Sequence, residues 1–210
     1  MSDILYLPFI SLFWWIVPYI YSVPDAAISK KKEFIEYSRS LIHAVITVIW
    51  LGLIPADKYM DDDYSLFISM WAKVSQSYFM FDIIISNSNL LNFHHVISII
   101  AAQGAVSYPC YSEIILTTFL ASELSNVVSH TDRLLQMCSI DHFQLFNIGI
   151  YIFIRNIFGL YYYGYILQYF FDWSLPAIVL LCIYMTIYIG SLYWSFLIIK
   201  EYRSKNRKEG

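Results

Sequence analysis

The residues of this chain that could do chemistry interrupt long apolar runs. Phe81-Asp82-Ile83 precedes a short loop of Ser and Asn, and Asn92-Phe93-His94-His95 opens the next apolar stretch. A neutral imidazole can act as a general base, or as a nucleophile toward an activated acyl group. A nearby carboxylate can hold the other ring nitrogen and fix the tautomer, as in a catalytic triad. His94, His95 and Asp82 are therefore the first catalytic candidates.

Further polar side chains lie inside other apolar segments. A charged side chain at the centre of a membrane span costs a few kcal/mol, so such residues normally face a bundle interior or a watery cavity. Glu123 is a further catalytic candidate, whose role would be to assist the molecule that accepts the acyl group. The residues assigned to substrate binding are His43, Ser125, Asn126 and Arg155. Arg155 is included because arginine binds oxyanions in a bidentate manner.

The segment around Glu123 carries a polar stripe. Ser122, Ser125, Asn126 and Ser129 recur at spacings of three and four, which places them on one side of a helix. Close helix packing through small residues is the alternative explanation for the serines.

A metal centre or a tightly bound cofactor is not expected. Membrane di-iron lipid enzymes use several HxxxH and HxxHH boxes, whereas this chain has five His residues in all. Its three Cys residues show no CxxC spacing for zinc and no disulfide framework. The paired histidines have a structural alternative too, in which they are simply buried and hydrogen-bonded to neighbours.

The composition is that of a membrane protein. Hydrophobic residues make up 59% of the 210 residues, charged residues make up 14%, and the mean hydropathy is +0.55. Soluble domains are nearer half apolar and a quarter charged. The aromatic content of 19% suits repeated passage through the membrane interface, where Tyr and Trp are enriched.

The apolar segments predict seven transmembrane helices, because about 20 apolar residues span the hydrocarbon core. The predicted spans are residues 4–23, 37–54, 65–86, 92–108, 112–130, 143–170 and 174–199. Pro8 and Pro18 lie within the first, which we expect to be kinked and to sit apart from the others. The domains expected are a first helix with a basic cytosolic loop (1–36), a six-helix domain (37–201) and a basic cytosolic tail (202–210).

Basic residues in the short loops set the orientation. They follow the first span and the last one, at Lys30, Lys31, Lys32, Arg39, Arg203, Lys205, Arg207 and Lys208. Seven crossings place these two groups on the same side of the membrane. We therefore expect a lumenal N-terminus and a cytosolic C-terminus.

The predicted spans bring the polar residues to one depth. Asp82 falls about one turn from the end of the third span, and His94 and His95 fall in the first turn of the fourth. His43, Glu123 and Asn126 are expected within about two turns of the same membrane face, with His130 and His142 in the loop beyond. The sequence thus predicts one polar site in one leaflet.

Six motifs in this order resemble the TLC family, named for translocating-chain-associated, longevity-assurance and neuronal-lipofuscinosis proteins and including the ceramide synthases. The resemblance spans residues 37–205. The motifs are Ser40-Leu41-Ile42-His43-Ala44, Tyr78-Phe79-Met80-Phe81-Asp82, His94-His95, Glu123-Leu124-Ser125-Asn126, Phe153-Ile154-Arg155, and Tyr193-Trp194-Ser195-Phe196 before Lys200.

The resemblance implies an all-α polytopic membrane protein in which six helices form a TLC-type barrel around a lipid cavity, with the first helix outside it. It also implies a His-dependent acyltransferase that uses acyl-CoA as co-substrate and a membrane lipid as acceptor. Ceramide synthases carry a His-Asp-x-Ser-Asp motif where this chain has Ser122-Glu123-Leu124-Ser125-Asn126. The pattern in this chain is closer to that of the small TLC-domain proteins of lipid homeostasis.

Two other function classes stay open. One is a non-catalytic lipid-binding sensor or trafficking protein that regulates membrane lipid composition, and the other is a channel, transporter or receptor. The expected partners are a membrane lipid or acyl chain, the lipid bilayer, and a homodimer mate or another membrane protein; nucleic acid is not expected. The expected location is the endoplasmic reticulum, with the plasma membrane as the alternative.

Overall fold

The computed structural model of the chain contains helices and no strands in the part it describes. It describes residues 12–14, 16–17, 22–55, 58–59, 61–140, 143–169 and 174–209. Two compact units divide the chain, Met1–Ile140 and Asp141–Gly210, and each is described by itself. The all-α prediction is confirmed for these residues. Most of the predicted first span, 4–23, lies outside them, and so does His142.

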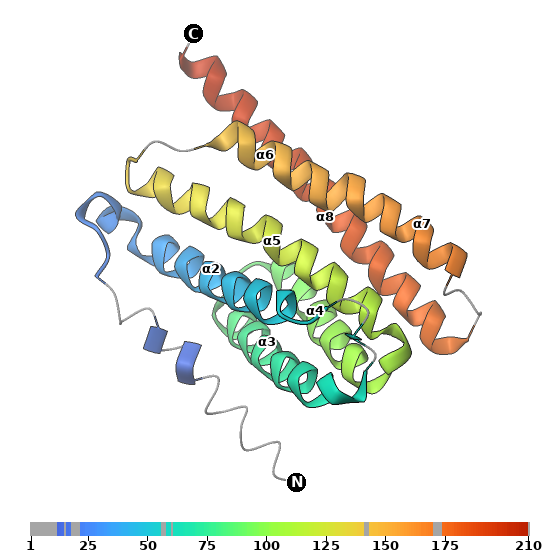
Figure 1. Ribbon diagram of the computed structural model, residues 1–210. Helices are drawn as coiled ribbons and strands as arrows, with labels where there is room; N and C mark the ends of the chain where they lie inside the picture. Colours follow the sequence, from blue (N-terminus) through green and yellow to red (C-terminus); the bar gives the residue numbers. More distant parts are fainter. Residues whose placement is uncertain are drawn as a thin grey trace. The chain divides into compact units, whose positions relative to one another are not determined.

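Four long helices form the first unit. They are α2 (Lys31–Gly52), α3 (Ser65–Ile85), α4 (Asn89–Ser107) and α5 (Ser112–Met137). In this unit α2 packs along α5, and α3 packs along α4 (Figure 1). A short 3-10 helix, Asp25–Lys30, leads into α2, where Ala27 and Phe34 form a small apolar core with Met137 at the end of α5.

Helix α4 begins earlier than the sequence predicts, at Asn89 instead of residue 92. The Ser88 side chain caps it by accepting a hydrogen bond from the backbone N–H of Leu91, at 3.3 Å. His94 and His95 therefore lie in the second turn of α4, and the prediction that placed them in the first turn is wrong. The helix dipole acts mainly on groups in the first turn, so its effect on these two histidines is weak.

Helix α5 ends later than predicted, at Met137 instead of residue 130. Leu, Gln, Met and Arg in the added turns are good helix formers, and nothing before Ser139 interrupts them. His130 therefore lies within α5, with its ring 5.7 Å from that of Tyr37, and the loop predicted for it is wrong. Glu123 lies roughly 20 Å from the end of the helix, further than the two turns predicted.

The chain leaves α5 through a left-handed residue, Ser139, whose φ is 56°. Only glycine adopts this conformation without a steric cost, which for other residues is about 1–2 kcal/mol. We expect Ser139→Gly to stabilise the protein by up to about 1 kcal/mol, since glycine also gives the unfolded chain more freedom. Thermal unfolding in detergent would measure this. The control is Ser129→Gly inside α5, which should destabilise; a loss of stability in both variants would contradict the prediction.

The second unit is a helical hairpin. Its first arm comprises α6 (Gln144–Ile152), a π-helical turn (Phe153–Phe158) and α7 (Gly159–Tyr169), and its second arm is α8 (Leu175–Glu209). The Asn156 side chain donates to Ser195 Oγ at 2.9 Å, and the Tyr184 hydroxyl donates to the carbonyl of Gly159 at 3.1 Å. Helix α8 continues beyond residue 199 through most of the predicted tail, where residues 200–209 contain no Gly or Pro that would stop it.

Four described helical segments are long and apolar enough to cross a membrane. They are Asp25–Gly52, Asn89–Ser107, Gln144–Gln168 and Leu175–Ser204. Helices α3 and α5 are also long, but they carry many of the polar side chains considered below, including Asp82 and Glu123.

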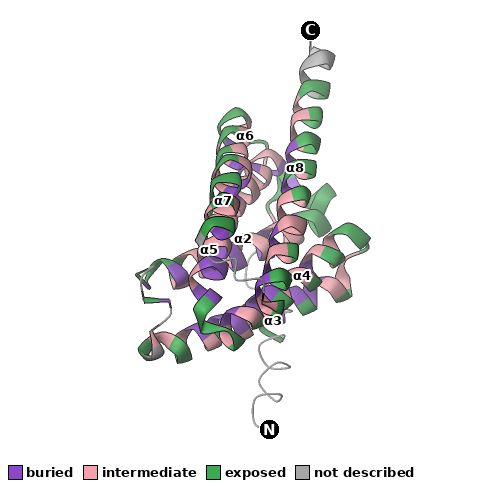
Figure 2. Cartoon of the chain, turned by 90° about the vertical axis from the view of Figure 1, so that its right-hand side faces the viewer, coloured by how far each residue is buried: buried purple, intermediate pink, exposed green. Residues whose placement is uncertain are grey.

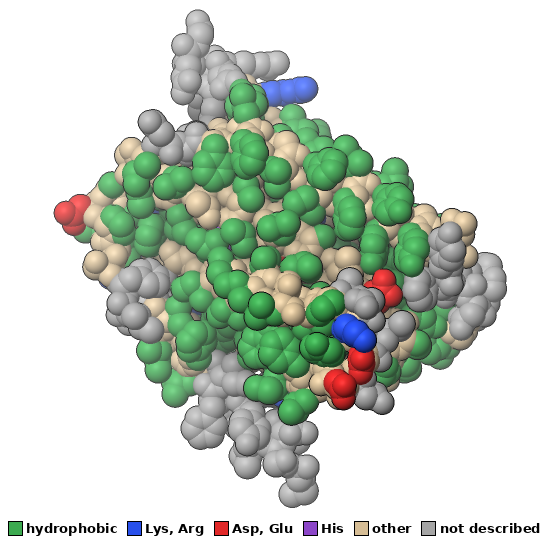
Figure 3. All heavy atoms as spheres, viewed as in Figure 1, with side chains coloured by type: hydrophobic (Ala, Val, Ile, Leu, Met, Phe, Trp, Pro, Cys, Tyr) green, Lys and Arg blue, Asp and Glu red, His purple; other side chains and the backbone are tan. Residues whose placement is uncertain are grey.

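The outer surface of these helices is largely apolar. Hydrophobic side chains predominate over charged ones on the face in Figure 3, and the helices in Figure 2 carry exposed residues along much of their length. The exposed large hydrophobic residues include Ile49, Leu66, Ile84, Leu145 and Leu175. Extensive exposed apolar surface is typical of a protein that contacts a membrane or a partner.

Candidate functional site

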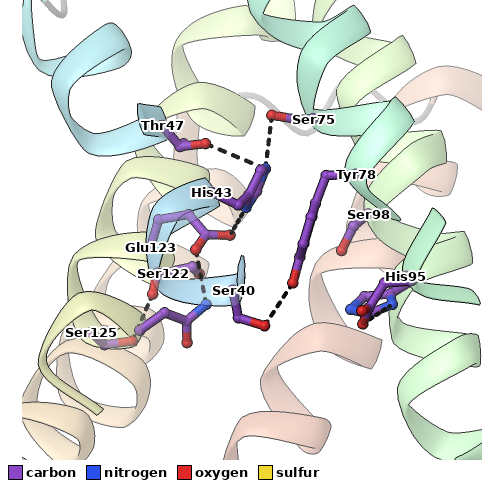
Figure 4. A network of polar contacts seen from close by, with 12 residues as sticks. Ser40, His43, Thr47, Ser75, Tyr78, His95, Ser98, Ser122, Glu123 and Ser125 are labelled. Atoms are coloured by element: carbon purple, nitrogen blue, oxygen red, sulfur yellow. Dashed lines mark hydrogen bonds and ion pairs between the residues drawn. The ribbon is translucent and has the colours of Figure 1, made fainter. Parts of the chain in front are cut away.

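The first polar cluster is centred on His43, which is 1% exposed. Its Nδ1 lies 3.7 Å from Oε1 of Glu123 on α5, and its Nε2 lies 3.2 Å from Oγ of Ser75 on α3. Thr47, one turn further along α2, places its hydroxyl 3.5 Å from the same Nε2 (Figure 4). Polar groups from three helices thus surround the ring, with Nε2 at hydrogen-bond distance from two hydroxyls and Nδ1 facing the Glu123 carboxylate.

Aromatic rings enclose this cluster. The Tyr78 ring stacks on His43 with centroids 4.0 Å apart and planes 11° apart, and its hydroxyl donates to Ser40 Oγ at 2.9 Å. Trp14 is completely buried with its ring 5.9 Å from His43, and its indole N–H donates to Ser77 Oγ at 3.2 Å. Trp14 thus packs against α2 and α3, and the prediction that this segment sits apart is wrong at Trp14.

Glu123 joins His43 to the predicted polar stripe of α5. Asn126 donates from Nδ2 to Oε2 of Glu123 at 3.0 Å, so each carboxylate oxygen faces a different partner. The buried hydroxyl of Ser125 donates to the Ser122 carbonyl of its own helix at 2.7 Å. A hydroxyl bonded in this way lets α5 pack closely, which supports helix packing as a role for this serine.

A second polar pair is formed by His95 on α4 and Asp82 on α3. Nδ1 of His95 lies 3.4 Å from Oδ2 of Asp82, and both residues are buried. Neither ring nitrogen of His95 forms a hydrogen bond with a described residue, and Nδ1 is buried beside Asp82 without completing one in this structure. One ring nitrogen therefore faces a carboxylate while the other is available to a ligand, which is the arrangement that a general base needs.

His94 has a different environment from His95. It is partly exposed, its ring is 5.7 Å from that of His95, and its carbonyl accepts a hydrogen bond from Ser98 at 3.0 Å. Adjacent residues of a helix point about 100° apart, so one carboxylate cannot orient both rings. The geometry thus favours His95 over His94 as the base.

Two aromatic residues stand between the polar clusters. The Phe79 ring lies 5.1 Å from the His43 ring and 5.2 Å from the His95 ring. Tyr78 lies 6.1 Å from His95, and Figure 4 shows it between the two histidines. His43 and His95 are therefore neighbours in one buried polar region, separated by a thin aromatic layer.

Arg155 belongs to the second unit. It lies in the π-helical turn, is 8% exposed, and its guanidinium carbon is 5.5 Å from the centroid of the Tyr151 ring. Short π-helical insertions occur frequently at functional sites. In the described part of the chain, no three His, Cys, Asp or Glu side chains gather closely enough to hold a metal ion.

Beside the predicted His43 and Asp82, the sequence prediction does not include four residues that helical spacing could have revealed, namely Ser40, Thr47, Ser75 and Tyr78. Ser40, His43 and Thr47 recur at three and four along α2, and so do Ser75, Tyr78 and Asp82 along α3. Each set forms one polar face within an apolar helix. No spacing pattern marks Trp14 as a site residue. The orientation argument assigns Arg39 to the basic loop residues, although it lies within α2.

The chain was also compared with known proteins. No family model matches it, and no curated protein matches it either. The resemblance to the TLC family, with the lipid chemistry and co-substrate that it implies, therefore stays a prediction.

Proposed function

We propose that this protein is a multi-pass membrane protein that transfers an acyl group to a membrane lipid, with His95 as general base and Asp82 as the residue that orients it. The observation that carries the proposal is the geometry of His95. Its Nδ1 lies 3.4 Å from the Asp82 carboxylate, and its Nε2 has no hydrogen-bond partner among the described residues. The four apolar helices long enough to cross a membrane support the lipid setting.

The reaction follows from these roles. Nε2 of His95 takes the proton from the hydroxyl or amine of the acceptor lipid as that atom attacks the acyl carbon of acyl-CoA. The new bond joins the acceptor oxygen or nitrogen to the acyl carbon, and the thioester C–S bond breaks. The proton on His95 then passes to the leaving thiolate, which restores the neutral imidazole. Asp82 stabilises the imidazolium that forms in between.

The other site residues have supporting roles in this proposal. His43 holds α2, α3 and α5 together through Glu123 and Ser75. Glu123 remains a predicted catalytic residue that assists the acceptor. The predicted substrate contacts remain Ser125, Asn126 and Arg155, and the six-helix TLC-type barrel also remains a prediction. The endoplasmic reticulum, with a cytosolic C-terminus, is the proposed location.

The test is direct turnover by the purified protein. Wild-type protein in nanodiscs is incubated with radiolabelled palmitoyl-CoA and a panel of acceptors that includes sphingoid bases, diacylglycerol and lysophospholipids. We expect label to appear in one acceptor class, with release of free thiol in equal amount. Empty nanodiscs are the control, and the absence of any labelled lipid above that control would remove the proposal.

A non-catalytic lipid-binding protein is the second candidate. It is favoured by the enclosure of His43, whose two ring nitrogens both face polar protein groups in a fully buried cluster. Such a cluster stabilises one packing and is not positioned to exchange protons with a substrate. Native mass spectrometry would then show a retained lipid on a protein that has no turnover, whereas a protein without bound lipid would count against this candidate.

A further inference from the structure

Arg39 is a buried cation whose charge is not balanced by a contact. It lies just over two turns into α2, about 12 Å along the helix from Lys31, and is 4% exposed. Its Nε is buried without a hydrogen-bond partner, and no described residue forms a hydrogen bond or a salt bridge with its guanidinium. Such an arginine is unusual, because buried charges are normally paired.

The surroundings of Arg39 place it beside the proposed catalytic pair. Its guanidinium carbon lies 4.7 Å from the centroid of the Phe81 ring, next in sequence to Asp82. Arg39 is close enough to interact electrostatically with the Asp82 carboxylate and with the Tyr78 phenol. The Glu36 carboxylate also interacts electrostatically with Asp82. None of these groups comes within salt-bridge distance of Arg39. Phe81 covers one face of the guanidinium without using its N–H donors.

An anion would complete this arrangement. Arginine presents five N–H donors in a rigid fork that matches the oxygens of a phosphate, and stacking on an aromatic ring leaves the edge of the fork available. His43 lies one turn along the same face of α2, and Asp82 with His95 lies on the adjoining helices. A phosphate at Arg39 would therefore sit next to the polar region described above.

We propose that Arg39 binds a phosphate group of the substrate. This inference rests on the proposed function, because it names the charged part of the ligand that the His95 and Asp82 site would receive. The phosphate has two sources, the headgroup of an acidic lipid or the phosphates of coenzyme A. The same guanidinium would bind either one.

Binding to the protein in neutral detergent tests this. The probes are dioleoyl phosphatidate, coenzyme A and inorganic phosphate, with dioleoylglycerol as the phosphate-free counterpart of the first. We expect a phosphate-bearing probe to raise the melting temperature of the wild type and dioleoylglycerol to raise it less. Arg39→Met should increase the apparent Kd for that probe by about tenfold to a hundredfold, the loss expected for a bidentate ionic contact.

Two further variants keep the result interpretable. Arg39→Lys keeps the charge without the fork, so its binding should fall between those of the wild type and Arg39→Met. Arg133→Met is the matched control, because Arg133 also lies over a tyrosine but donates to Gln136 at 2.6 Å. Its affinity for the probe should match the wild type. If Arg39→Met does not fold, the comparison of Arg39→Lys with the wild type decides.

The outcomes separate this inference from the proposed reaction. If phosphatidate binds in an Arg39-dependent way, the phosphate comes from a lipid headgroup. If coenzyme A binds in this way, the phosphate comes from the acyl donor. Both results support the inference even if no acyl group is transferred. Binding of inorganic phosphate alone indicates a free anion and also supports it. The inference is overturned if no phosphate-bearing probe binds the wild type, or if Arg39→Met and Arg39→Lys bind as the wild type does.

Discussion

His95→Gln is expected to lower acyl transfer by about 10²- to 10⁴-fold, the usual contribution of a general base. Glutamine keeps a polar side chain of similar size but cannot accept and release a proton at neutral pH. Asp82→Asn should reduce the rate by about 10²-fold or more, since the amide cannot stabilise the imidazolium. Single-turnover measurements with labelled palmitoyl-CoA would report both effects apart from product release.

His94→Gln is the matched control for this experiment. It changes the adjacent histidine, which is more exposed and lies about 100° around the helix from His95, so its rate should stay within about threefold of the wild type. The assignment of His95 fails if the two glutamine variants lose activity equally, or if His94→Gln loses more. Circular dichroism of each variant shows that it is still folded.

Breaking the contact between His43 and Glu123 is expected to have the largest effect on stability. The two residues are 1% and 6% exposed, so His43→Leu removes a polar neighbour of a buried carboxylate, at a cost of about 1–3 kcal/mol. Removing both groups in His43→Leu/Glu123→Leu should cost less than the sum of the single changes, with a coupling energy of about 1–3 kcal/mol. Unfolding by SDS in mixed micelles, followed by circular dichroism, would measure all three variants.

The control for this cycle is a buried hydrogen bond elsewhere on α2. The Tyr59 hydroxyl donates to the carbonyl of Leu51 at 2.9 Å, so Tyr59→Phe should cost about 1 kcal/mol. Combined with Glu123→Leu, its effect should add within about 0.5 kcal/mol, because Leu51 lies about 12 Å along α2 from His43. If the effects of His43→Leu and Glu123→Leu also add, the two side chains are not energetically coupled.

The spacing of polar residues within each helix could be predicted from the sequence, but their partners could not. The predicted pairing of Asp82 with a histidine corresponds to an observed distance of 3.4 Å, because a short connection brings the end of α3 next to the start of α4. Glu123 is 80 residues from His43 in the sequence, and only the packing of α2 along α5 brings them together. Local patterns do not encode such long-range pairings.

Helix ends were the weakest part of the sequence prediction. Hydropathy marks where an apolar run stops, whereas a helix stops where its backbone groups are capped or the chain turns. Ser88 therefore starts α4 before the apolar run, and α5 continues through polar residues until Ser139 adopts a positive φ. These shifts moved the histidines into the second turn of α4 and His130 into α5.

Composition and residue spacing are sufficient to predict that the chain is helical and apolar enough for a membrane, since both properties are local. The tertiary structure decided which of the polar residues meet. It placed Arg39 and Trp14 inside the first unit, surrounded the His43 ring with polar groups from three helices, and left Nε2 of His95 without a partner among the described residues. The physical reason is that the hydrogen bonding and burial of a side chain depend on neighbours from other helices, which the order of residues along one helix does not specify.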